Sequence, residues 1–295
     1  PYTFRYRVDG VTADFEYLSG KLHKFSIEVS KKSQSGLGFK LLGNSITAWE
    51  TDNTSHDASA REYIIIDVPE ANADESALKL AIAEAGYDYT DIKNLKVTGY
   101  INNWDFAFMR DDMTKLQSLN LKDITITANS NILIGTVGWL SGNANEIPGS
   151  AFKDKKTLVR FVFPNNITSI GESSFSGSNL TGSLLIPNSV SIIEKRAFFG
   201  LSTLNGELKL PDNLVIVGTG AFQNCSGLNG ELHIPSKVTT IGSGAFDGCS
   251  SFTGSLNLPE SLTNLGDDSV NGAFAGCIGL TGSLKIPQNI IRRYF

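Results

Sequence analysis

The sequence predicts a mainly β protein: a solenoid of short parallel strands, one per coil of 23 or 24 residues, with a helical N-terminal cap and a small β-sandwich before it. Two periodic features lead to this fold class. A phenylalanine preceded by Ala or Ser recurs at intervals of 23, 23, 24, 24 and 28 residues: Phe152, Phe175, Phe198, Phe222, Phe246 and Phe274. A proline follows the same step: Pro164, Pro187, Pro211, Pro235, Pro259 and Pro287. Fixed periods of this length are typical of stacked repeats that share one continuous core.

Each position of the repeat has a physical explanation. In "GSLNLP", Leu256 and Leu258 point to one side of a short strand, while Ser255 and Asn257 point to the other. The proline that follows ends the strand, because it has no N–H to continue a ladder. Apolar residues three and six positions after each proline supply a second inward pair, and the next glycine, such as Gly242, permits a turn with positive φ. The phenylalanine rings are therefore expected to form a ladder inside the coils.

The three cysteines occupy one position of the repeat, three residues after the phenylalanine. They are Cys225, Cys249 and Cys277, and the matching residues of earlier coils are Lys155, Ser178 and Leu201. Cysteines stacked on successive coils have parallel Cα–Cβ vectors, which suit a disulfide poorly. We interpret them as buried packing thiols; a metal or redox role is the alternative.

The repeated frame carries a family resemblance. "AFxGCxxLTGxLxIPxxVxxIGxxAF", matched unit by unit over 148–290, resembles the BspA-like leucine-rich repeat, named for surface proteins of host-associated anaerobic bacteria. The stretch 113–126 reads as a general leucine-rich strand, and 127–146 as an irregular inserted loop. Residues 70–112 look like the N-terminal cap of such solenoids, with a helix predicted independently by an apolar stripe that includes Leu78 and Ile82.

Residues 1–69 contain no copy of the repeat. Strands are expected at 2–8, 24–30, 45–49 and 62–68. We interpret this segment as a small β-sandwich of immunoglobulin-like character with Trp49 in its core. The predicted domains are thus the sandwich, 1–69, and the solenoid, 70–295, with its cap at 70–112. A loose calcium loop at Asp52, Asn53 and Asp57 is an open alternative for the polar run between strands.

Composition limits the partners. A formal net charge of −5 argues against nucleic acid, which requires a basic face. The apolar run at 63–68 is too short to span a membrane. Because the chain begins at Pro1, we expect that a leader has been removed. Such a leader would also permit a lipid anchor. The family resemblance implies export to a cell surface or outer envelope, where the partner would be an extracellular protein or glycan.

The sequence offers no catalytic constellation, and we expect neither enzymatic activity nor a cofactor. His23, His56 and His233 have no partner at ligand spacing. Ser76 to Lys79 matches the S-x-x-K pattern of serine acyl enzymes, but its companion motifs are missing and it falls in the first turn of the predicted helix. We interpret that match as chance.

The outward strand positions form the candidate binding surface. One column is Ser183, Glu207, Glu231, Ser255 and Ser283, and the next is Leu185, Lys209, His233, Asn257 and Lys285. Trp139, in the insertion, is a second candidate contact. These side chains either simply face water or form a docking face, as in solenoids generally. The resulting hypothesis is adhesion to a host or neighbouring-cell protein. The alternative is glycan capture, with 1–69 binding carbohydrate and the solenoid acting as a spacer.

Overall fold

The computed structural model describes four strands within the first 60 residues, and then residues 63–134, 138–266, 272–288, 290 and 292–293. Contacts divide the chain into two units, Pro1–Ala60 and Arg61–Phe295. The boundary predicted from the sequence lies after residue 69, because the strand at 62–68 was assigned to the first unit. In the structure that strand, β5 (Ile64–Val68), pairs in parallel with β6 (Asn94–Ile101) of the second unit.

The first unit contains two antiparallel hairpins among its described residues. β1 (Tyr2–Val8) pairs with β2 (Val11–Tyr17), and β3 (Ile27–Ser30) pairs with β4 (Gly38–Leu41). The strand predicted at 2–8 is confirmed, and β3 lies within the strand predicted at 24–30. The immunoglobulin-like sandwich stays a prediction, since Trp49 and the calcium candidates Asp52, Asn53 and Asp57 lie outside the described residues.

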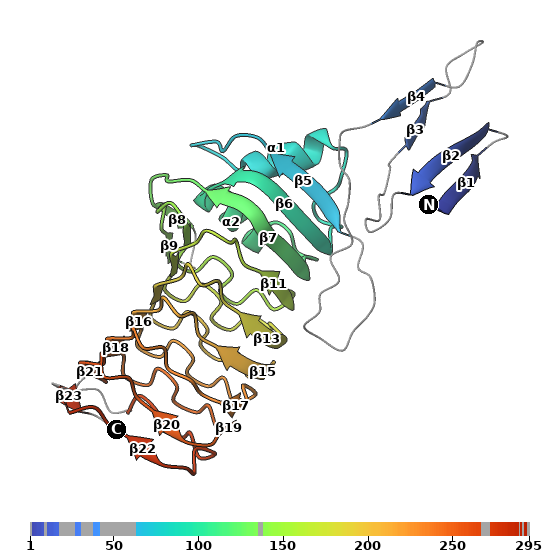
Figure 1. Cartoon of the computed structure of the whole chain (residues 1–295). Helices are drawn as coiled ribbons and strands as arrows, with labels where there is room; N and C mark the ends of the chain where they lie inside the picture. Colours follow the sequence, from blue (N-terminus) through green and yellow to red (C-terminus); the bar gives the residue numbers. More distant parts are fainter. Residues whose placement is uncertain are drawn as a thin grey trace. The chain divides into compact units, whose positions relative to one another are not determined.

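The second unit begins with a parallel four-stranded sheet in the order β11-β7-β6-β5. Its other two strands are β7 (Ser118–Ile126) and β11 (Arg160–Val162). Helix α1 (Ala77–Glu84) connects β5 to β6, and helix α2 (Asn103–Asp111) connects β6 to β7 (Figure 1). The helix expected around Leu78 is thus present, whereas α2 was not predicted.

The following coils are held by strands on two sides (Figure 1). On one side, pairs of parallel strands alternate: β13 (Gly182–Leu185) with β15 (Leu204–Lys209), β17 (Gly230–Glu231) with β19 (Phe252–Thr253), and β20 (Leu256–Asn257) with β22 (Leu284–Lys285). On the other side runs a seven-stranded parallel sheet: β10 (Glu146–Ile147), β12 (Ser169–Ile170), β14 (Ile192–Ile193), β16 (Ile216–Val217), β18 (Thr240–Ile241), β21 (Asn264–Leu265) and β23 (Arg292–Arg293). The predicted parallel-strand solenoid is therefore confirmed.

The seven-stranded sheet forms where the sequence indicated only a second inward pair. Its buried residues lie six positions after each repeat proline, as in Ile193, Val217 and Ile241. Where a glycine follows the strand, it donates its N–H one coil back: Gly218 to Ile193 O and Gly242 to Val217 O, both at 2.8 Å. The longest continuous ladder of the solenoid thus runs along this side.

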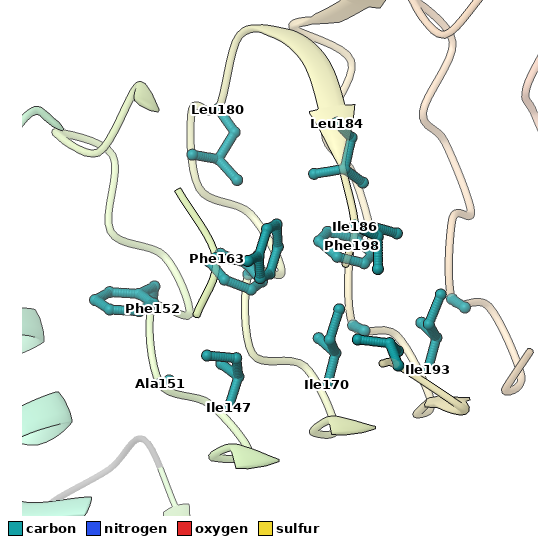
Figure 2. Close-up of a cluster of buried hydrophobic side chains, with 14 of the residues drawn as sticks. Ile147, Ala151, Phe152, Phe163, Ile170, Leu180, Leu184, Ile186, Ile193 and Phe198 are labelled. Carbon is teal, nitrogen blue, oxygen red and sulfur yellow. The ribbon is translucent and has the colours of Figure 1, made fainter. Parts of the chain in front are cut away.

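The phenylalanine ladder lies inside the coils, as predicted. The rings of Phe175, Phe198, Phe222, Phe246 and Phe274 stack with centroids 5.4, 5.2, 5.4 and 5.3 Å apart and planes within 13° of parallel. Backbone bonds follow the same ladder; Phe222, for example, donates its N–H to Ala245 O at 2.7 Å. Figure 2 shows the rings between the isoleucines of the seven-stranded sheet and residues such as Leu184 from the opposite strands. Burial of one such ring contributes about 1.5–3 kcal/mol.

The repeat glycines act differently from the prediction. Gly218 and Gly242 do not have positive φ; a Cβ there would lie 2.6 and 2.5 Å from backbone atoms of the preceding coil. These glycines therefore allow close stacking. The left-handed turns fall two residues before and two residues after each phenylalanine, as at Gly220 (φ 62°) and Asn224 (φ 62°). Only Gly266, with φ 70°, matches the expectation.

The insertion at 127–146 is a β-hairpin and not the irregular loop that was expected. β8 (Ile132–Ile134) pairs antiparallel with β9 (Gly138–Leu140). Its base is held against α2, because Asn103 Nδ2 donates to Ser130 O at 2.7 Å. Leu140 at the end of the hairpin is fully buried. Because apolar and polar residues alternate only weakly in this stretch, its pattern does not indicate strands.

Candidate functional site: the outward strand face

The candidate site is the row of outward side chains on β13, β15, β17, β20 and β22, which we call the strand face. It comprises a first column, Ser183, Glu207, Glu231, Ser255 and Ser283, and a second column, Leu185, Lys209, His233, Asn257 and Lys285. Nine of these ten residues are exposed and Ser255 is half-buried. The structure therefore brings all ten predicted residues onto one surface of the solenoid.

The strand face rests on a row of buried leucines. Leu184, Leu208, Leu232 and Leu256 alternate with the two columns and are at most 7% exposed. Figure 2 shows Leu184 on the side of the phenylalanine rings that faces away from the isoleucines of the seven-stranded sheet. Because strand residues alternate between faces, this packing fixes both columns outward.

Glycines keep the first column low on the surface. In the following coil, a glycine lies beside the first-column side chain. A Cβ on Gly206 would lie 2.2 Å from Ser183 Oγ, and one on Gly230 would lie 3.0 Å from Glu207 Cγ. First-column side chains thus lie against the glycine of the following coil. From the sequence, these glycines were recognised only as part of the repeat frame, and their contact with the first column was not predicted.

The middle of the strand face carries opposite charges in its two columns. Glu207 and Glu231 belong to the first column, and Lys209 and His233 to the second. His233 Nε2 lies 3.7 Å from Glu231 Oε2, with side chains 84% and 66% exposed. The contact is an ion pair only when His233 is protonated, and a pair so exposed contributes at most about 1 kcal/mol. Both side chains can therefore exchange this contact for one with a ligand at small cost.

The second column continues with an apolar pair toward the N-terminal side. Leu185 is 54% exposed, and Val162, 23 residues earlier on β11, is 39% exposed. Val162 was not among the predicted residues. The signal was present, because "RFVFP" at 160–164 aligns with "SLLIP" at 183–187. The strand face therefore extends at least one coil beyond the predicted set.

Most of the other residues singled out in the sequence lie outside what the structure describes. Trp139 lies on β9 opposite Leu133, and its side chain is outside the described part of the chain. His23 and His56 also lie outside the described residues. His233 is the one histidine that the structure describes, and it is a surface residue, as expected.

The outward side of the seven-stranded sheet is a second regular surface, which the sequence analysis did not identify. Hydroxyl side chains beside it bond from coil to coil: Ser191 Oγ donates to Thr168 O at 3.3 Å, and Thr263 Oγ1 to Thr239 O at 3.2 Å. The strand residues themselves, such as Ile192 and Ile216, are half-buried. Because its polar groups already bond within the solenoid, this side offers a ligand less than the strand face.

The cysteines form a buried column, as predicted. Cys225, Cys249 and Cys277 are free thiols whose Sγ atoms donate to backbone carbonyls 3.0, 3.1 and 3.0 Å away, which belong to the phenylalanine of the preceding coil. Burial raises the pKa of Cys225 to about 12 and that of Cys277 to about 11, and it raises the pKa of Cys249 further still. Thiols held protonated in this way are poor nucleophiles and metal ligands.

Lys155 fills the same position three coils earlier. Its ammonium donates to Arg110 O and Met113 O, both at 2.7 Å, at the C-terminal end of α2. The side chain is only 7% exposed, and burial lowers its pKa to about 8. The residue therefore joins the first coil of the phenylalanine ladder to α2.

Ser76 is a structural residue and not a nucleophile. It is the N-cap of α1, its Oγ accepts from Lys79 N at 3.1 Å, and it donates to Asp105 Oδ1 at 2.7 Å. Asp105 also accepts from Leu78 N and Asn102 N, each at 2.9 Å. Burial raises the pKa of this carboxyl, although the four hydrogen bonds favour its ionised form. The S-x-x-K match is thus explained by the start of a helix.

Two further features of the described residues bear on function. Within them, no three His, Cys, Asp or Glu side chains gather in a group that could hold a metal ion. No helix of that same part of the chain is long and apolar enough to cross a membrane.

Comparison with known proteins agrees with the repeat. Residues 82–205 and 178–294, more than half of the chain, match the BspA type leucine rich repeat region in six copies. The chain belongs to the BspA-type leucine-rich repeat family. No match was found among curated proteins.

Solved structures of bacterial leucine-rich repeat proteins are similar to this BspA-type chain. A leucine-rich repeat protein of T. pallidum is 20% identical over 64% of this chain and 73% of its own, with a TM-score of 0.41. One from Bacteroides ovatus is 20% identical over 65% of this chain, which spans only 54% of that protein, with a TM-score of 0.35. A leucine rich cell surface protein of Faecalibacterium prausnitzii is 15% identical over 92% of this chain and 95% of its own, with a TM-score of 0.25.

Proposed function

We propose that this BspA-type chain is a non-enzymatic recognition protein of a bacterial cell surface. Its ligand is a macromolecule, a protein of a host or of a neighbouring cell, and it binds through the strand face. The observation that carries the proposal is the strand face itself: two columns of side chains over five coils, nine of the ten exposed, with a buried leucine between the columns in four of the coils. Such a surface is broad and regular, which suits an extended macromolecular ligand better than a small molecule.

Two further points support recognition over catalysis. Lys155, Asp105 and Cys225, whose pKa values burial displaces, lie in coil-to-coil or helix-to-helix contacts. Their hydrogen bonds go to backbone carbonyls and amides that hold the fold. Perturbed groups of an active site instead converge on a cleft. Here, the titratable side chains with the strongest shifts serve the solenoid.

A binding screen with matched charge variants tests the proposal. The full chain is offered to an immobilised panel of extracellular matrix proteins and to a glycan array. The variant Glu207→Lys/Glu231→Lys changes the strand face, while Glu172→Lys/Glu194→Lys makes the same change of charge beside the seven-stranded sheet. Circular dichroism and thermal melts check that both variants fold. Binding to a protein that is lost in the first variant and retained in the second supports the proposal; equal binding by both contradicts it.

The same screen separates the alternative of glycan capture. Residues 61–295 form a unit of their own that contains every described core residue, so a chain shortened to 61–295 keeps that core. Glycan binding that disappears with residues 1–60 and ignores both charge variants favours the alternative. Protein binding retained by residues 61–295 favours the strand face.

A further inference from the structure

The stacked phenylalanines measure the step from one coil to the next. Their ring centroids are 5.2–5.4 Å apart between Phe175 and Phe274, with planes within 13° of parallel. Rings this parallel occupy equivalent places in their coils, so the centroid distance approximates the translation between coils. An α-helix rises about 5.4 Å per turn, whereas side chains on one face of an extended strand recur every ~6.6 Å. The step of this solenoid therefore matches a helix.

The mismatch with an extended peptide accumulates along the surface. A strand lying along the solenoid axis gains about 1.3 Å on each coil, and over four coils it is out of step by about one whole coil. A helix in the same place keeps one turn over each coil, so its rows of side chains at i, i+4 and i−1, i+3 stay in register. A regular strand face thus offers equivalent contacts to successive helical turns.

The charges of the strand face favour a particular helix. The two columns are separated by two residues along each strand, or about 6.6 Å. Over two consecutive coils the first column is acidic, with Glu207 and Glu231, and the second is basic, with Lys209 and His233. Neighbouring rows of a helix can carry basic residues over the first column and acidic residues over the second. The reverse arrangement would place like charges together at both coils.

The two preceding coils favour an apolar turn at one end of that helix. Val162 and Leu185 are exposed by 39% and 54%, and they lie at the same position of consecutive coils. Large apolar side chains of a ligand would be covered there. The glycines beneath the first column, such as Gly230, leave the surface low enough for a helix to approach along the axis.

We propose that the strand face binds an amphipathic α-helix of a partner protein, laid along the solenoid axis with one turn over each coil. The helix spans four coils, from Val162 to His233, and is about 14 residues long. It carries large apolar residues at one end, then Lys or Arg at i and i+4 over Glu207 and Glu231, and Asp or Glu at i−1 and i+3 over Lys209 and His233. This inference rests on the proposed function, because it specifies the ligand of the same face.

A random 20-residue peptide display library, panned on the full chain, tests the inference without a known ligand. We expect the enriched peptides to share an apolar and charge pattern with a period of 3.6 residues. Synthetic versions should gain helical circular dichroism on binding, and replacing two central residues with proline should abolish binding. Enrichment of peptides with a period of two, or no enrichment at all, overturns the helical ligand.

Charge reversal tests the assigned columns. Glu207→Lys/Glu231→Lys should weaken binding of the selected peptides about tenfold, since two exposed pairs become two like-charge contacts. Peptides with Glu in place of the basic row should recover that loss on the variant. The control Glu172→Lys/Glu194→Lys should leave affinity within about twofold. Selected peptides that bind both variants equally overturn the placement on the strand face.

The failure of this inference can be told from the failure of the proposed function. If peptides of period two are selected and the strand-face variant weakens them, the helix is wrong and the binding face stands. If neither peptides nor matrix proteins respond to the strand-face variant, the proposed function falls with it.

Discussion

Phe222 and Asn257 occupy two positions of the repeat that face in opposite directions. Phe222 is fully buried and stacks on Phe198 and Phe246, 5.2 and 5.4 Å away, while Asn257 is exposed on the strand face. We expect Phe222→Ala to lower the free energy of unfolding by about 3–5 kcal/mol because it leaves a cavity between two rings. Asn257→Ala should change it by less than about 0.5 kcal/mol. Urea denaturation measures both; similar losses would contradict the inward and outward assignment.

The three buried cysteines should react slowly with thiol reagents in the folded chain. Cys277, with a thiol pKa near 11 in place of the ordinary 9.0, has about a hundredfold less thiolate at pH 8, and burial adds to this. We expect a chromogenic disulfide reagent to react slowly with the native protein. In urea, where the chain is unfolded, it should react rapidly with all three thiols. Cys277, which is 8% exposed, should react before Cys225 and Cys249, which are fully buried. Rapid labelling of the native chain would contradict a packing role.

Lys155 predicts a pH dependence that can be isolated with one variant. Its pKa falls from the usual 10.5 to about 8 on folding. Between pH 8 and 10.5 the unfolded chain therefore binds more protons at this site than the folded chain, and the site's contribution to the free energy of unfolding rises with pH. The unfolding free energy of the wild type minus that of Lys155→Met should accordingly become more positive from pH 7.5 to pH 10. A difference that shrinks over this range would show that the ammonium is stabilised in the fold.

At the scale of single residues, the sequence was sufficient where burial follows the period. The inward phenylalanines, the buried cysteines and all ten strand-face residues were predicted, because alternation and a fixed repeat settle which side faces the core. The conformation of Gly218 and Gly242 was not. A glycine required for close stacking looks the same in a sequence as one required for positive φ, and only the backbone of the neighbouring coil distinguishes them.

At the scale of elements, the close spacing of strands in successive coils depends on such glycines. A Cβ at Gly242 would lie 2.5 Å from Thr219 N in the preceding coil. We expect Gly242→Ala to push β18 from β16 and to cost about 1–3 kcal/mol. Glu194 occupies the same position after β14 and already carries a side chain, so Glu194→Ala is the matched control and should stay within about 0.5 kcal/mol. An equally mild Gly242→Ala would show that the coils can separate there.

Elements outside the repeat were predicted less well than the coils. The helix α2 was missed, although Asn102 and Asp105 form a capping box whose N-x-x-D spacing is visible in the sequence. The strand at 62–68 was predicted but assigned to the wrong unit, since an apolar strand does not reveal its partner. Pairing with β6 is a long-range contact that local pattern cannot supply. The hairpin β8–β9 is a local pairing, and it was missed because its strands show little alternation.

At the scale of the whole molecule, each coil is stabilised only by its neighbours. An interior coil has a neighbour on both sides, whereas the last described coil has one. This difference is visible in equivalent residues: Leu256 is 7% exposed and Leu284 is 48% exposed. Phe246 is fully buried, while Phe274 is partly buried. Stability should therefore vary along the solenoid in spite of the nearly identical sequences of its coils.

Hydrogen exchange measures this gradient directly. The amides of Phe198 and Phe222 donate to Ala221 O and Ala245 O at 2.8 and 2.7 Å in the interior, so they should exchange only through large openings of the solenoid. Amides of residues 272–288 should exchange faster because fraying of one coil costs only one interface. Phe222→Ala should speed exchange in the coils on both sides of residue 222 and leave α1 unchanged. Uniform protection along the chain, unaltered by that substitution, would mean that the coils unfold as one unit and not by nearest-neighbour coupling.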